Sequence, residues 1–370
     1  MKKLNWAIWR EAFTGSERDF TRGSINAAIF LLALPMILEM MMESIFAIVD
    51  MFFVAKLGHD SVAVVIFTES MMAIIYAMAI GLSISATATV ARRVGEHDSE
   101  GAARAAAHAI YLGASFSALL SLVGIAFAPN FLHVLGASPE VIAEGTAFTR
   151  IMLGGNFVVV FLFLLNAIFR GAGDASVAMR VLFWANLCNI ILSPCFVFGP
   201  DVFKAVGIDA PQWLLNIWPF PHLGVVGAAV GTTIGRGVGA LIAASLLLRS
   251  SGRITLHREH WTFDAKILKN LIQIAAPAIL QMTVGTASWS VLVSVVSHFG
   301  SEAIAGYGIG MRVIMFVLLP AMGLSNAAAT LVGQNLGANQ PERAEASVWR
   351  AAYINVVFLG GTGLLLWLFS

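Results

Sequence analysis

Three carboxylates stand within one apolar stretch, "ILEMMMESIFAIVD", at residues 37–50. A helical period of about 100° per residue places Glu39, Glu43 and Asp50 on one helix face. An ionised group that faces lipid is costly, so this face must line protein or a water-filled cavity. Such a cluster can take up and release a proton, offer oxygen ligands to Na⁺, or attract a cationic ligand. The other interpretation is a set of protonated acids hydrogen-bonded to neighbouring helices.

Composition predicts the kind of element that carries these acids. The chain has 370 residues, of which 58% are hydrophobic and 12% charged, and its mean hydropathy is +0.83. Apolar runs of about 20 residues are typical of transmembrane helices and are too long for barrel strands. We therefore expect an all-α polytopic membrane protein with nine spans, near 26–54, 61–90, 104–128, 141–169, 180–199, 224–248, 268–297, 304–333 and 345–369.

The distribution of Lys and Arg predicts the orientation of the spans, because these residues stay on the cytoplasmic side during insertion. With the N-terminus inside, the outer segments hold only Lys56, Arg150 and Lys204, and the inner segments hold most of the others, Arg170 among them. Arg236 lies near the inner end of its span, so we expect its side chain to extend toward the membrane surface. The chain is thus predicted to lie in a bacterial inner membrane with a cytoplasmic N-terminus.

The sequence repeats itself with a constant offset. "ALPMILEM" begins at residue 33 and "AAPAILQM" at residue 275, an offset of 275 − 33 = 242 residues, which also aligns Gly95 with Gly337. Six predicted spans separate the two copies, so both copies run in the same direction across the membrane. Duplications of this kind form two-lobed transporters that bind substrate between the lobes.

The offset also predicts the domain limits. Residues 1–24 form a cytoplasmic or interfacial segment, 25–252 a first lobe of six helices, 253–267 an inter-lobe loop, and 268–370 a partial second lobe. Because 370 − 242 = 128 is the end of the third span, we expect the second lobe to be truncated after three of six helices.

Other polar residues inside the spans are candidates for the same cavity. Glu69 is either a further cavity acid or a protonated structural one, and Arg312 is either a counter-ion to an acid or a structural tie to carbonyl groups. The sequence contains neither a Walker motif nor a GxSxG motif, so we expect no enzyme activity and no cofactor. A net charge of +1 does not favour a nucleic-acid partner. An ion gradient, of H⁺ or Na⁺, is the expected energy source.

Several motifs resemble the multidrug and toxic compound extrusion (MATE) transporters, and the DinF-like branch is the nearest in character. The resemblance covers nearly the whole chain, and "RGAGD" (170–174) and "VGQNLGA" (332–338) are its most specific parts. The other matching segments are residues 19–37, 46–58, 189–199, 224–233 and 306–331. The resemblance implies two six-helix lobes around a central cleft and export of cationic or amphipathic compounds in exchange for Na⁺ or H⁺.

The resemblance also implies roles for single residues. Asp50 matches the ion-coupling acid of the first helix and is therefore the candidate Na⁺ ligand, while Asn189 and Thr232 match polar lining residues of the same lobe. Asn166 begins the "NAIFRGAGD" match and joins the candidate lining. The family motif often has an acid where this chain has Ser193, so Glu39 and Glu43 are hypothesised to compensate for it.

We therefore expect a monomeric, ion-coupled antiporter that exports cationic or amphipathic small molecules through the lipid bilayer. A lipid-linked sugar flippase of the same superfamily is one alternative, although Arg and Lys rather than acids would be expected in its cleft. An inactive fragment or membrane scaffold is the other alternative.

Overall fold

The computed structural model describes residues 6–205, 207, 211, 215, 218–249, 253–299 and 301–368. The predicted boundary between the first lobe and the inter-lobe loop, at residue 252, lies outside the described residues. In the described part the chain is helical, and nine helical segments are long and apolar enough to cross a membrane, as predicted. No strand occurs among these residues.

The first lobe contains six of these crossings. They are α2 (Ile25–Ala55), α3 (His59–Gly95), α4 (Ser99–Val134), α5 with α6 (Pro139–Gly154 and Asn156–Ala172), α7 (Ala175–Phe198) and α10 (Val225–Leu248). The fourth crossing is divided at Gly155, whose N–H still donates to the carbonyl of Ile151. Short elements flank the crossings: α1 (Trp6–Thr14) with exposed Trp6 and Trp9, η1 (Gly199–Asp201), α8 (Val202–Ala205) and η2 (Arg258–Trp261).

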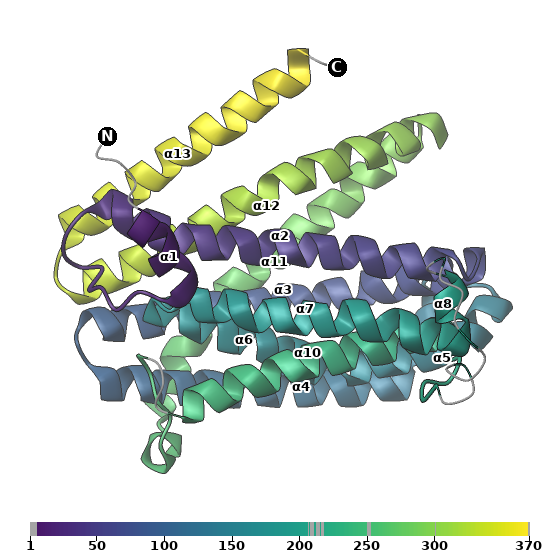
Figure 1. Ribbon diagram of the computed structural model, residues 1–370, viewed down its shortest axis with the longest axis horizontal. Coiled ribbons are helices and arrows are strands. Elements are labelled where there is room, and N and C mark those ends of the chain that lie inside the picture. Colours follow the sequence, from purple (N-terminus) through teal and green to yellow (C-terminus); the bar gives the residue numbers. More distant parts are fainter. Residues whose placement is uncertain are drawn as a thin grey trace.

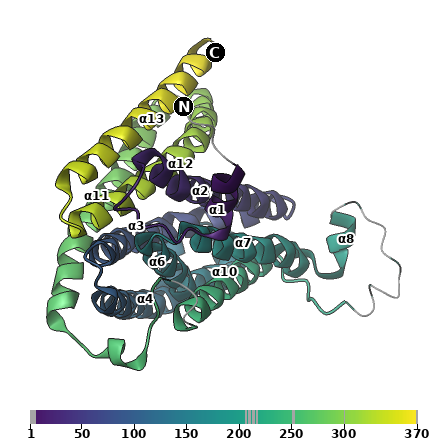
Figure 2. The same cartoon turned by 60° about the vertical axis from the view of Figure 1, so that its left-hand side comes forward.

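Three further helices follow the inter-lobe loop, namely α11 (Ala265–Ser297), α12 (Ser301–Gly337) and α13 (Pro341–Leu368). Figure 1 shows that α12 and α13 lie close to α2 at the end of the molecule where α1 lies and diverge from it toward the opposite end. Figure 2 shows these helices on one side of the first lobe, with α8 on the other side. The buried apolar core runs through the first lobe, chiefly between α3, α4, α6, α7 and α10.

Close backbone contacts confirm the internal repeat. A Cβ atom added to Gly81 on α3 would lie 2.8 Å from the backbone nitrogen of Ile279 on α11. A Cβ atom added to Gly323 on α12 would lie 2.7 Å from the backbone nitrogen of Ile37 on α2. Both pairs of equivalent residues differ by the predicted offset, since 323 − 81 and 279 − 37 are each 242. The repeat therefore maps the Gly81–Ile279 contact onto the Gly323–Ile37 contact and back. This is expected for lobes related by an approximate two-fold axis along the membrane normal.

Candidate functional site

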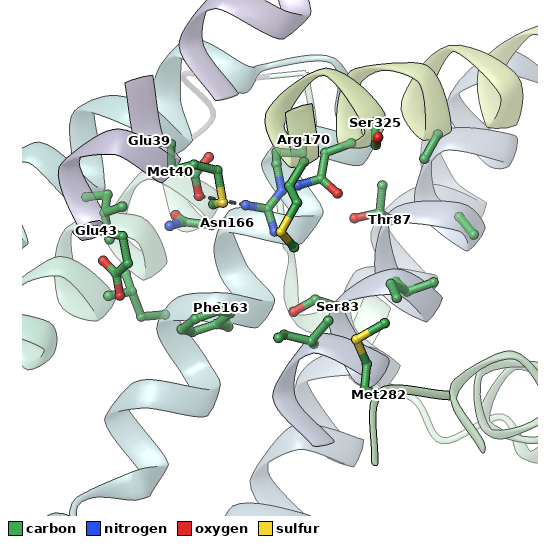
Figure 3. Close-up of a pocket in the computed structure, with 18 residues that line it drawn as sticks. Glu39, Met40, Glu43, Ser83, Thr87, Phe163, Asn166, Arg170, Met282 and Ser325 are labelled. Atoms are coloured by element: carbon green, nitrogen blue, oxygen red, sulfur yellow. Dashed lines mark hydrogen bonds and ion pairs between the residues drawn. The ribbon is translucent and has the colours of Figure 1, made fainter. Parts of the chain in front are cut away.

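A cavity of about 300 Å³ lies between the first lobe and the helices of the second. Helices α2, α3, α6 and α7 line it from one side, and α11 and α12 line it from the other (Figure 3). Its wall combines apolar and polar side chains. The main ones are Glu39, Met40, Glu43, Ser83, Thr87, Phe163, Asn166, Arg170, Met282, Met322, Ser325 and Asn326.

Glu39 and Arg170 form a buried ion pair in this cavity. Arg170 Nη1 donates to Glu39 Oε1 at 2.6 Å, and the two residues are 8% and 2% exposed. Figure 3 shows the guanidinium directed from α6 toward α2. The count of cytoplasmic cations placed Arg170 in an inner segment, and this placement is wrong. Helix α12 covers the last turn of α6, and the Thr330 hydroxyl of α12 donates a hydrogen bond to the Arg170 carbonyl there.

Glu43 forms a second ion pair one turn further along α2. Arg236 Nη2, on α10, donates to Glu43 Oε1 at 2.6 Å. Arg236 is 4% exposed, so the expectation that it extends to the membrane surface is wrong. The Glu43 carboxylate on the neighbouring helix α2 pairs with one nitrogen of the guanidinium, and the side chain therefore turns inward rather than toward water.

Asp50 on α2 contacts Ser193 on α7. The Ser193 hydroxyl donates to Asp50 Oδ1 at 2.8 Å. One turn inward, the Asn189 amide donates to the Thr232 hydroxyl at 2.9 Å. Helices α7 and α10 can approach this closely because Gly231 has no side chain. A Cβ atom at this position would lie only 2.6 Å from the Cα atom of Ser193. The predicted residues of α2, α7 and α10 are therefore brought together inside the first lobe.

These contacts follow one another in depth along the lobe. From the end of the cavity outward they are Glu39–Arg170, Glu43–Arg236, Asn189–Thr232 and Asp50–Ser193. We call this series of four side-chain pairs the polar spine. Two of its members, Arg170 and Arg236, were not among the predicted site residues. The available signal was the shared face of Thr232 and Arg236, which are one helical turn apart.

The other predicted residues lie in different surroundings. Asn166 is 2% exposed and lines the cavity, whereas Glu69 lies on an exposed part of α3. The side chain of Arg312 lies outside the described residues. Met40 also lines the cavity, together with Met282 and Met322 of the second lobe. Unbranched thioether side chains adapt to ligands of different shape, so these residues suit a wall that accepts several compounds.

Unpaired polar atoms show what the cavity can bind. Oε2 of Glu39 and Oε2 of Glu43 are both buried and have no hydrogen-bond partner within the described structure. A buried acceptor that lacks a partner is unfavourable, and a ligand with N–H or O–H donors would relieve this. The cavity can thus bind an amphipathic ligand, with apolar walls for its body and carboxylates for its polar group.

Comparison with known proteins agrees with this architecture. A sequence model of the MatE family matches residues 35–195 and 277–370. The chain is 26% identical to the FAD transporter of Shewanella oneidensis over 341 residues, which cover 90% of this chain and 70% of that protein. It is 26% identical to the multidrug export protein MepA of Staphylococcus aureus over 323 residues, which cover 87% and 67%.

Solved structures share the fold over most of the chain. A MATE protein in the straight conformation has a TM-score of 0.84 and 25% identity, and the match covers 95% of this chain and 74% of that one. A multidrug resistance MATE transporter in an outward-facing conformation has a TM-score of 0.83 and 26% identity, with 95% and 73% covered. The family match over both lobes, the nine crossings and the repeat agree: the chain is a multi-pass membrane protein that belongs to the MatE family.

Proposed function

We propose that this protein is an ion-coupled antiporter that exports cationic, amphipathic small molecules, with Asp50 as the site where the coupling ion acts. The relatives named as multidrug exporters support an export function. We further propose that it lies in the inner membrane with a cytoplasmic N-terminus, that it acts as a monomer, and that the coupling ion is H⁺ or Na⁺. Assignment to the DinF-like branch stays a prediction.

One observation carries the choice of substrate. Two carboxylates, those of Glu39 and Glu43, line a cavity whose wall also contains large apolar side chains, and each carboxylate has one oxygen without a partner in the described structure. A cation with an apolar body would gain an ion pair at Glu39 or Glu43 and bury its remaining surface against Met40, Phe163 and Met282. A cavity of about 300 Å³ is of the size that binds small organic molecules.

The coupling role of Asp50 rests on its place in the polar spine. Asp50 is held by Ser193 and lies two turns from Glu43 on the same face of α2. A proton or Na⁺ at Asp50 would change the charge of the spine without occupying the cavity. Binding of the coupling ion and of the substrate would then influence each other through the charges of acids that lie on one face of α2.

The test is transport in proteoliposomes that contain the purified protein. We expect uptake of tetraphenylphosphonium driven by an imposed H⁺ or Na⁺ gradient, and loss of this uptake in Asp50→Asn with the protein still inserted. Wild-type uptake by Asp50→Asn would contradict the coupling role. Absence of tetraphenylphosphonium uptake and of any thermal stabilisation by this cation would favour the inactive fragment or membrane scaffold.

A second candidate is export of an anionic amphipathic molecule. It is favoured by Arg170, which lines the cavity although it was not among the predicted site residues, and by the relative named as an FAD transporter. A guanidinium binds phosphate groups well, as a lipid-linked sugar diphosphate or a dinucleotide would require. Thermal stabilisation by FAD but not by tetraphenylphosphonium would favour this candidate.

A further inference from the structure

Arg236 has more hydrogen-bonding capacity than it uses. Its Nη2 pairs with Glu43, while Nε and Nη1 have no partner among the described residues. These two nitrogens carry three N–H donors, and the side chain is 4% exposed. Leaving buried donors of a charged group unpaired is unfavourable, so this guanidinium is suited to a second acceptor.

The position of the guanidinium indicates which acceptor this is. Its central carbon lies 5.1 Å from the ring centroid of Phe46, a cation–π contact. Phe46 follows Glu43 by one helical turn and precedes Asp50 by one turn on α2. The guanidinium therefore lies over the ring that separates the two carboxylates, and it is bonded to only one of them.

Charges on the surrounding helices leave Asp50 as the suitable partner. On α2, Glu39 is already paired with Arg170 of α6. On α3, Glu69 and Tyr76 lie within electrostatic range of Arg236, but Glu69 is exposed. Asp50 is also within electrostatic range and is held toward α7 by Ser193.

We propose that Arg236 is a counter-ion that Glu43 and Asp50 share. When the charge of Asp50 is neutralised by the coupling ion, Arg236 pairs with Glu43, the arrangement observed here. When Asp50 is unoccupied and negative, Arg236 moves along the Phe46 ring toward Asp50, and the Glu43 carboxylate becomes available to a cationic substrate in the cavity. The inference rests on the proposed antiport function and supplies its mechanism, because substrate and coupling ion then bind alternately.

This arrangement makes a prediction that direct binding of substrate to Asp50 does not make. In Asp50→Asn the neutral amide leaves Arg236 paired with Glu43, so tetraphenylphosphonium binding is weakened, about tenfold. In Asp50→Asn/Arg236→Gln, Glu43 has no counter-ion, so binding returns to within about threefold of the wild type. Gradient-driven uptake stays absent in the double variant, because it lacks the site for the coupling ion.

The experiment measures tetraphenylphosphonium binding by isothermal titration calorimetry with the purified full chain, in sodium-free buffer at about pH 8, far above the ordinary pKa of an aspartate. Arg150→Gln is the matched control, because Arg150 is an exposed arginine of the same lobe. Adding Arg150→Gln to Asp50→Asn should not restore tetraphenylphosphonium binding. Recovery in Asp50→Asn/Arg236→Gln supports the shared counter-ion, and continued weak binding overturns it. No binding to the wild type overturns the proposed function and this inference together.

If the Arg236→Gln proteins do not insert into the membrane, a second pair of variants tests the same inference. With Glu43→Gln the cavity lacks the carboxylate through which Asp50 acts, so adding Asp50→Asn should weaken binding no further. Equal affinities of Glu43→Gln and Glu43→Gln/Asp50→Asn support the inference. A further loss of affinity in the double variant would show that Asp50 contacts the cation itself, and would refute it.

Discussion

Gly95 and Gly337, which end α3 and α12, each lie against the backbone of the other helix at its repeat-related position. A Cβ atom on Gly95 would overlap the carbonyl oxygen of Gln334, and one on Gly337 would overlap the carbonyl oxygen of Arg92. Since 337 − 95 and 334 − 92 are both 242, one contact is the image of the other under the repeat. The approximate symmetry axis therefore passes between these helix ends, where the backbones of the two lobes lie against each other.

We predict that Gly95→Ala and Gly337→Ala destabilise the contact between the two lobes at this end by similar amounts. The added methyl group meets backbone rather than a flexible side chain, so the helices must separate, at a cost of about 1–3 kcal/mol. The measurement is the thermal unfolding midpoint in detergent, together with labelling of a cysteine placed at Ala88 by a water-soluble thiol reagent. Gly285→Ala is the control, because nothing lies within 4 Å of a Cβ atom at Gly285. Equal stability of all three variants would contradict the prediction.

Removing Arg170 should destabilise the first lobe strongly. Arg170→Gln leaves the buried Glu39 carboxylate without its counter-ion, and breaking a buried pair from one side costs about 3–5 kcal/mol. Glu39→Gln/Arg170→Gln should cost less than Arg170→Gln alone, because it leaves no buried charge unpaired. A double-mutant cycle on unfolding in detergent measures this difference. Additive effects of the two single changes would show that the pair contributes no coupling energy.

The start of α11 should depend on pH through Asp264. The Asp264 carboxylate accepts a hydrogen bond from the backbone N–H of Lys266, which lowers the pKa of Asp264 below its ordinary value. Because the folded-state pKa is lowered, this cap is present above the unfolded pKa of 3.8 and is lost as the pH falls through the lower, folded value. A spin label at Lys269 should therefore become more mobile only in acid.

Two variants at this position provide controls for the pH dependence. Asp264→Asn can still accept the hydrogen bond but does not titrate, so its label mobility should not change with pH. Asp264→Ala lacks the cap and should give a mobile label at neutral pH. The backbone N–H of Asp264 also donates to Nε2 of the buried His108 at 2.7 Å, which anchors the loop on α4 in all three proteins. Identical acid transitions in wild type and Asp264→Asn would contradict the assignment.

Arg343 should hold the N-terminal segment in place. Its guanidinium donates to the carbonyls of Phe20, Arg22 and Gly23 at 2.9–3.1 Å, and it connects the first turn of α13 to this segment. Arg343→Gln should speed tryptic cleavage after Arg22 severalfold, with little change in global stability. Arg258→Gln, an exposed arginine of the inter-lobe loop, is the control. Unchanged cleavage in Arg343→Gln would show that other contacts order the segment.

Several features of this protein could be predicted from the sequence alone. The apolar runs determined the nine crossings, because backbone groups in lipid must be satisfied within each helix. The constant offset of 242 residues determined which helices of the two lobes are equivalent. Helical periodicity placed Glu39, Glu43 and Asp50 on one face, and all three lie in the polar spine.

Only the tertiary structure decided what those acids contact. Along the sequence, Arg170 follows directly after a predicted span, and Arg236 was expected to extend to the membrane surface, where an arginine reaches water. In the fold, each arginine pairs with a carboxylate of α2 at 2.6 Å. Arg170 and Glu39 are 131 positions apart in the chain, and Arg236 and Glu43 are 193 positions apart. Periodicity fixes the face on which a side chain lies, but the partner across that face depends on helix packing. Charge pairing between distant helices therefore turned two predicted surface cations into buried members of the candidate site.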